Sequence, residues 1–152
     1  MSTKYAGTVE EVAALDLYIK LSRAAESATQ RINRHLHDDN LTLSQFGVLE
    51  ALYFLGPLQP GQLAQKVLKS GGNMTLVIDN LAKRGLVTRQ RRQDDRRCID
   101  VEITGEGRAL IASIFPGHVA GVVEAVSVLS VEEQQQLAAL LRKLGLSVNR
   151  EQ

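Results

Sequence analysis

The sequence predicts a mainly α-helical fold that carries one small β-hairpin. Hydrophobic residues make up 44% of the 152 residues and aromatic residues only 4%, which is typical of a core of Leu, Val, Ile and Ala packed between helices. Most apolar residues recur at helical spacing, and only one stretch, near residues 86–103, alternates as a half-buried strand does. The length fits a single domain, or one core with appended helices.

The first element is a long amphipathic helix, expected over residues 9–37 because its apolar residues repeat on one face. The polar residues 38–40 should end it. Thr42 and, three residues later, Gln45 have the spacing of a capping box and predict the start of a second helix. Gly and Pro at residues 56–57 should end that helix.

A short helix, a tight turn and another helix come next. Pro60 suits the first turn of the short helix, and residues 70–72 should supply the turn. Gly85 ends the following helix, whose inward stripe is Met74, Val77, Ile78 and Leu81. At about 100° per residue, its outward face then carries Asn73, Thr75, Leu76, Asp79, Asn80 and Lys83.

A basic β-hairpin should follow directly, with residues 86–91 and 98–103 as strands and residues 92–96 as the tip. Residues 83–97 hold seven Lys or Arg and two Asp, a net charge of +5, whereas the whole chain carries only +1. One dense basic segment on a mildly acidic body favours contact with a polyanion at a single place. A solvated surface loop is the alternative.

Two further helices complete the chain. Thr104 should cap a long helix, bent or broken near residues 116–117, and Ser130 with Glu133 predicts a second capping box. The last helix bears the apolar stripe Leu137, Leu140, Leu141 and Leu144. Together with the first helix, this apolar surface exceeds what so small a core needs, and a second copy of the chain is expected to cover it.

The order of elements is that of a winged helix-turn-helix, in which the second helix of the pair enters the major groove of DNA. Arginines on the hairpin suit phosphates and a narrow minor groove. The segment SGGNMTLVIDNLAKRGLVTR at residues 70–89, with Asp95-Arg96-Arg97 and with ITGEG at residues 103–107, resembles the signature of the MarR family of transcriptional regulators. The match extends to the flanking helices and so covers nearly the whole chain.

The resemblance implies one MarR-like unit over residues 1–152. A winged helix-turn-helix DNA-binding region would span residues 41–104, with dimerisation helices over residues 9–38 and 105–148. The partners implied are a second copy of the chain and double-stranded DNA with an inverted-repeat operator, and the regulator would be a repressor. Within the family the chain is most similar to repressors that respond to quinones and hydroquinones, so a small aromatic, phenolic or quinone-like effector is expected.

The resemblance also implies roles for individual residues. Arg97 looks like a wing arginine that enters the minor groove, and Asp95 like the acid that orients it. Arg89 and Arg91, on the outgoing strand, are expected to contact phosphates. The recognition-helix positions are Ser70, Gly72, Asn73, Thr75, Leu76, Asn80 and Lys83, and the wing positions are Arg89, Arg91, Arg92, Asp95, Arg96 and Arg97. Tyr18, Arg23 and Tyr53 are candidates for lining an effector pocket, since aromatic faces and a cation suit a phenol.

Two other functions stay open. Cys98 lies beside Arg96 and Arg97, which would favour its thiolate and a redox-responsive regulator, although the chain has no second cysteine to resolve an oxidised form. The second alternative function is that of a winged helix used only for protein contacts, but such a module would not need the +5 segment.

Several classes of function are disfavoured. No stretch approaches 18 uninterrupted apolar residues, and residues 1–10 lack the pattern of a signal peptide, so a cytoplasmic protein is expected. His35 and His37 lie about 200° apart on a helix and cannot bind one metal ion together. No phosphate loop, nucleophile elbow or catalytic triad is recognisable, so neither an enzyme nor a cofactor is expected.

Overall fold

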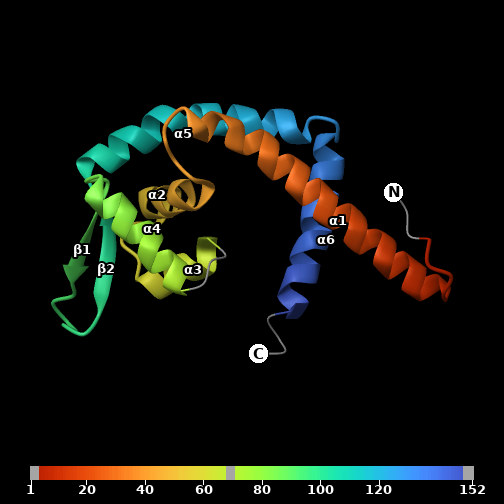
Figure 1. The fold of residues 1–152 in the computed structure, drawn as a ribbon, viewed down its shortest axis with the longest axis horizontal. Helices are drawn as coiled ribbons and strands as arrows, with labels where there is room; N and C mark the ends of the chain where they lie inside the picture. Colours follow the sequence, from red (N-terminus) through yellow and green to blue (C-terminus); the bar gives the residue numbers. More distant parts are fainter. Residues whose placement is uncertain (1–3, 68–70, 149–152) are drawn as a thin grey trace. The chain divides into compact units, whose positions relative to one another are not determined.

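The computed structural model describes residues 4–67 and 71–148, and it confirms a mainly helical chain with one antiparallel hairpin (Figure 1). The elements follow the predicted order. They are α1 (Val9–Asn33), the 3₁₀ helix η1 (Arg34–His37), α2 (Leu43–Leu55), α3 (Pro60–Val67), α4 (Gly71–Lys83), β1 (Val87–Arg91), β2 (Ile99–Ile103), α5 (Gly105–Val126) and α6 (Val131–Val148).

The chain divides into two compact units. One unit is Asn33–Val119 and holds the helix pair, the hairpin and the first part of α5. The other combines Met1–Ile32 with Ala120–Gln152. The buried apolar core lies entirely in the first of these, between residues 36 and 114.

The core of the Asn33–Val119 unit forms between the hairpin and the helices that surround it. Its fully buried side chains come from η1, α2, α3, α4, both strands and α5, and the largest include Leu36, Phe46, Leu49, Leu52, Leu63, Met74, Ile78, Leu81, Val101 and Ile111. The segment between α2 and α3 joins the hairpin edge through two backbone hydrogen bonds between Leu58 and Val101, at 3.2 and 2.8 Å. This pairing fixes the β2 edge of the hairpin to the segment between α2 and α3.

The junction between α4 and the hairpin depends on two glycines. Gly85 adopts a positive φ of 70°, and the Leu86 amide donates to the Leu81 carbonyl oxygen, so α4 ends in the left-handed cap that the sequence predicted. The Thr104 hydroxyl donates to the Gly85 carbonyl oxygen at 2.7 Å and accepts from the Gly107 amide at 3.0 Å. A Cβ at Gly107 would lie 2.3 Å from the Leu86 carbonyl oxygen, so only glycine fits there.

Among the residues whose burial is described, the unit formed by Met1–Ile32 and Ala120–Gln152 has no interior of its own. No residue of 4–32 or 120–145 is buried in the single chain. Large apolar side chains are exposed along its helices, among them Leu15, Leu17, Tyr18, Val123, Leu137, Leu140, Leu141 and Leu144.

The capping boxes are confirmed, and three predicted boundaries are corrected. Thr42 with Gln45, and Ser130 with Glu133, form reciprocal hydrogen bonds. The first helix is regular only to Asn33 and continues as η1. Gly71 and Gly72 lie in the first turn of α4 rather than in a turn before it, because the first amides of a helix need no partner within it.

The third correction concerns α5. Pro116 does not break it, and the helix runs from Gly105 to Val126. Contrary to the expectation from sequence, α5 is also long and apolar enough to cross a membrane when judged by length and composition alone. Gly107, Ile111 and Ile114 are buried in the core of the Asn33–Val119 unit, whereas most of the apolar window of α5 is not buried in the single chain.

Candidate nucleic-acid interface

Helix α4 presents the outward face that its periodicity predicts. Met74, Ile78 and Leu81 are buried and Val77 is half-buried, while Asn73, Thr75, Leu76 and Lys83 are exposed and Asn80 is half-buried. Gly72 is exposed, and a Cβ there would meet nothing within 4 Å. Ser70, the first recognition-helix position expected, lies outside the described residues.

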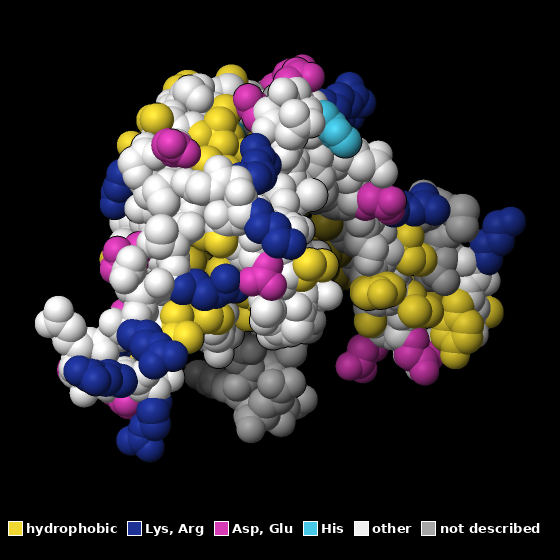
Figure 2. Space-filling model, turned by 60° about the vertical axis from the view of Figure 1, so that its left-hand side comes forward, with side chains coloured by type: hydrophobic (Ala, Val, Ile, Leu, Met, Phe, Trp, Pro, Cys, Tyr) yellow, Lys and Arg dark blue, Asp and Glu magenta, His cyan; other side chains and the backbone are white. Residues whose placement is uncertain are grey.

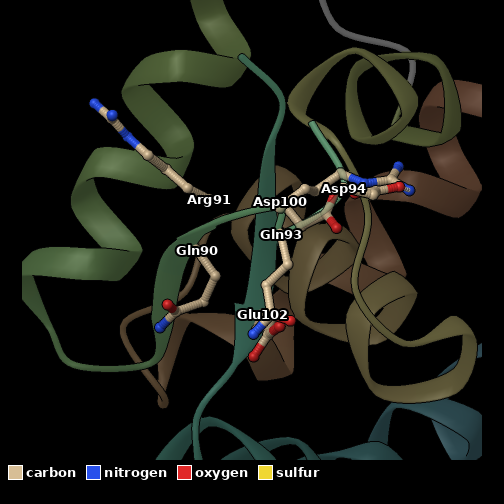
Figure 3. A pocket seen from close by; sticks show the side chains of 7 residues that line it. Gln90, Arg91, Gln93, Asp94, Asp100 and Glu102 are labelled. Carbon is tan, nitrogen blue, oxygen red and sulfur yellow. Dashed lines mark hydrogen bonds and ion pairs between the residues drawn. The ribbon is translucent and has the colours of Figure 1, made fainter. Parts of the chain in front are cut away.

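The hairpin has two chemically different faces. The register pairs Val87 with Ile103, Arg89 with Val101 and Arg91 with Ile99, so apolar side chains and two arginines share one face. The opposite face carries Gln90, Asp100 and Glu102 and borders an open hollow of about 490 Å³ that is also lined by Arg91, Arg92, Gln93 and Asp94. Figure 3 shows Arg91 pointing away from these acids. The basic character expected of the whole hairpin therefore belongs to one face and the tip.

An ion pair that no local pattern in the sequence predicts joins the hairpin to α4. Arg89 Nη2 of β1 donates to Asp79 Oδ1 of α4, and the two side chains are 35% and 42% exposed. Asp79 is the acid on the outward face of α4. The pair places opposite charges together and links β1 to the helix. The predicted phosphate contact of Arg89 stays a prediction.

The hairpin tip is ordered by its own carboxylates. Asp94 accepts two hydrogen bonds from the Arg92 guanidinium, at 2.9 and 2.7 Å, and these bonds lower the pKa of Asp94. Asp95 Oδ1 accepts from the Arg97 amide at 3.0 Å and lies 3.5 Å from Arg97 Nε. The Arg97 side chain is 94% exposed, so the acid holds the base of a side chain whose end is free to reach outward. Figure 2 shows Lys and Arg side chains gathering at the projecting lower-left end of the molecular face in view.

The pKa of the Cys98 thiol is shifted in the direction opposite to that expected from its neighbours in sequence. Partial burial raises the pKa of the Cys98 thiol, and the charge and hydrogen bond of Asp95 raise it further. The thiol Sγ lies 3.7 Å from Asp95 Oδ2, whereas Arg96 and Arg97 are exposed. The thiolate is therefore disfavoured, which weakens the redox hypothesis. Among residues 4–67 and 71–148, no group of three or more His, Cys, Asp or Glu residues could hold a metal ion.

Arg84, one of the seven basic residues of the charged segment, serves the fold instead. Its Nη1 donates to the Asn40 carbonyl oxygen at 2.7 Å and its Nη2 to that of Asp39 at 3.5 Å. Asn40 has a positive φ of 52°. Arg84 thus connects the end of α4 to the loop that precedes α2.

The candidate effector residues are divided between the two units. Tyr18 and Arg23 belong to the unit without a core, and both are exposed, whereas Tyr53 is half-buried in the other unit. Arg108, which the sequence analysis missed, lies over the Tyr53 ring at 5.8 Å from its centroid. Further ring contacts link Tyr53 to Phe54, Phe54 to Phe115 and Phe115 to His118. Aromatic residues at helical spacing on 46–54 and 115–118 were the available signal.

Comparison with known proteins assigns the chain to a family. The MarR family model matches residues 41–99, which are the helix pair and most of the hairpin. The HTH-type transcriptional regulator MhqR of Bacillus subtilis is 38% identical over 133 residues, which cover 88% of this chain and 92% of MhqR.

Two solved structures are similar over most of their length. Sco3205, a MarR family transcriptional regulator from Streptomyces coelicolor in complex with DNA, has a TM-score of 0.79 and 26% identity, covering 95% of this chain and 91% of Sco3205. NadR in complex with 4-hydroxyphenylacetate has a TM-score of 0.73 and 25% identity, covering 95% of this chain and 96% of NadR. Since the relatives span the flanking helices as well as the winged helix, the chain belongs to the MarR family of transcriptional regulators.

Proposed function

We propose that the protein is a homodimeric, cytoplasmic transcriptional repressor that binds an inverted-repeat operator in double-stranded DNA. It acts by binding rather than by catalysis. The observation that carries the proposal is that one unit joins two surfaces suited to DNA. These are the outward face of α4 and the arginine face of the hairpin, linked by the ion pair of Arg89 and Asp79. The DNA complex of Sco3205 supports the same use of the fold.

The proposed interface has two parts with different tasks. The recognition helix would contact base edges through Gly72, Asn73, Thr75, Leu76, Asn80 and Lys83, with Ser70 before it. The wing would contact the backbone and minor groove through Arg91, Arg96 and Arg97, while Arg89, Arg92 and Asp95 hold it in shape. The acidic face with Asp100 and Glu102 would point away from the duplex.

A gel-shift titration at two salt concentrations tests the class of function. A DNA-binding regulator should lose affinity steeply as salt rises, with a slope that counts its phosphate contacts. A winged helix that contacts only proteins should bind no duplex at either concentration, and that result would refute the proposal.

Dimerisation follows from the unit that has no buried residue. Helices α1 and α6 and the end of α5 expose apolar side chains, and a single chain does not cover them. Apolar faces of this extent stay soluble when they pack against a second chain. Light scattering of the DNA-free protein at micromolar concentration should give the mass of a dimer, and a monomer would contradict the arrangement.

The effector we propose is a small aromatic or phenolic molecule. Its support is the bound 4-hydroxyphenylacetate in NadR and the aromatic cluster of this chain, in which Arg108 lies over Tyr53. Tyr18 and Arg23 remain further candidates for binding the effector. Calorimetry and DNA-release assays with a panel of phenols and quinones test this. Tyr53→Ala should abolish the response. Tyr18→Phe should preserve ring contacts with the effector. A panel without any response would refute the ligand class.

A further inference from the structure

The most exposed apolar side chain on α4 is Leu76, with 61% of its surface accessible. An exposed leucine is ordinary on most helices. Its position on this helix is informative, because at about 100° per residue Leu76 lies opposite the buried stripe, roughly 140° to 160° from Met74, Ile78 and Leu81. Leu76 is therefore the centre of the outward face.

The residues around Leu76 leave its side chain room to reach a partner. Gly72 lies one turn earlier, where the side chain of a helical residue at position 76 projects, and the space around it is open. The Thr75 hydroxyl donates to the Gly71 carbonyl oxygen at 3.1 Å, so its proton is engaged within the helix. Asp79, the one carboxylate on this face among residues 71–83, is paired with Arg89.

The charges on α4 argue against guanine at the centre of the contact. Guanine is usually read by Arg or Lys. The one cation in α4 is Lys83, its last residue, which lies about 10 Å along the axis from Leu76 at 1.5 Å per residue. Asn80 is one turn from Leu76, about 6 Å along the axis, and an amide suits adenine. Thymine offers the apolar group of the major groove, its C5 methyl.

We propose that Leu76 is a specificity-determining residue that contacts the C5 methyl of a thymine in each operator half-site, with Asn80 binding an adenine within about two base-pair steps. This inference rests on the proposed function and refines it. The half-site would then be centred on A·T pairs. Sequence selection at its centre would come from an apolar contact and an amide, while Lys83 and the wing contact the duplex outside that centre.

Deoxyuridine substitution tests the contact directly, because deoxyuridine differs from thymidine only by the missing methyl. Duplexes are first selected from random DNA with the full-length protein. Each thymine of a selected half-site is then replaced in turn. At one thymine, the wild type should lose about fourfold in affinity per half-site, the value for one buried methyl-sized group, and about sixteenfold when both half-sites are changed.

The variants identify the side chain responsible. Leu76→Ala should bind unmodified DNA more weakly and show no further loss with deoxyuridine, and Leu76→Met should retain part of the methyl sensitivity. Lys83→Ala, on the same helix, should keep the full deoxyuridine effect while its salt slope falls by about one. Thermal unfolding of each variant shows whether the fold is intact.

Three results would each overturn the inference while leaving the proposed function standing. The first is DNA binding by the wild type that is insensitive to deoxyuridine at every thymine. The second is a selected half-site with G·C pairs at its centre, and the third is a deoxyuridine penalty of equal size in Leu76→Ala. Failure to select any DNA would instead refute the proposed function.

Discussion

The ion pair between Asp79 and Arg89 makes a prediction in which geometry and net charge disagree. A model based on charge alone predicts that Asp79→Asn binds DNA more tightly, because it removes a negative charge from the face that meets the duplex. The structure predicts weaker operator binding, because the acid holds β1 against α4 and so sets the wing relative to the recognition helix.

The magnitude follows from the exposure of the pair. With side chains 35% and 42% exposed, the pair should contribute about 0.2 to 1 kcal/mol to the free energy of unfolding. The ratio of operator affinity to random-duplex affinity should fall about fivefold, which corresponds to the upper end of this energy range, since a misplaced wing loses specific contacts. Random duplex, which needs no register, should bind as well as before.

The assay is a double-mutant cycle of Asp79→Asn and Arg89→Gln, measured by fluorescence anisotropy on operator and on random duplex. Asp100→Asn is the matched control, since it removes one negative charge from the hairpin face turned away from Arg89. The double variant should lose less than the two single variants combined. Tighter operator binding by Asp79→Asn, of the size seen for Asp100→Asn, would refute the positioning role and leave only charge.

Further predictions address the tip, the thiol, the loop before α2 and the operator. Asp95→Ala should weaken operator binding although it makes the wing more positive, and Arg97→Ala should cost about 1 to 3 kcal/mol on operator in the same anisotropy assay; tighter binding by Asp95→Ala would reduce the wing to a basic patch. Cys98 should react with iodoacetamide more slowly at pH 8 than a small free thiol, because its raised pKa keeps it protonated there, and Asp95→Asn should speed the reaction. Arg84→Met should lower the free energy of unfolding by about 1 kcal/mol through loss of its bonds to the carbonyl oxygens of Asn40 and the preceding residue, and an unchanged melting temperature would contradict that role. Footprints should lie on an inverted repeat with half-site centres about 10 base pairs apart or a small multiple of that, and protection of direct repeats without a dyad would count against the dimer.

The elements of the fold were predictable because each has a local signal. Capping residues such as Thr42 and Ser130 mark helix starts, and alternation from Ile99 to Ile103 marks a strand. The errors arose where a local rule was outweighed. Glycine at residues 71–72 suggested a turn, but the first turn of a helix tolerates it, and Pro116 removes one hydrogen bond from a helix held by many others.

The partners of individual arginines were not predictable, because they depend on tertiary contacts. Arg84 meets a loop more than forty residues away, and Arg89 meets a helix that precedes it by ten residues. Composition counted both as part of one basic cluster, although both have partners within the chain. The same limitation hid Arg108 above Tyr53.

The uneven distribution of the core links the stability of the protein to its abundance. The Asn33–Val119 unit, which carries the winged helix, has an interior of its own, whereas no residue of 4–32 or 120–145 is buried in one chain. Under the proposed assembly, those helices gain an interior only on association, so their melting temperature should rise with protein concentration by mass action. Dilution would unfold them before the winged unit. A cell that makes little of this regulator would then hold protomers exposed to proteolysis, and operator occupancy would respond to its level more steeply than binding by a preformed dimer allows.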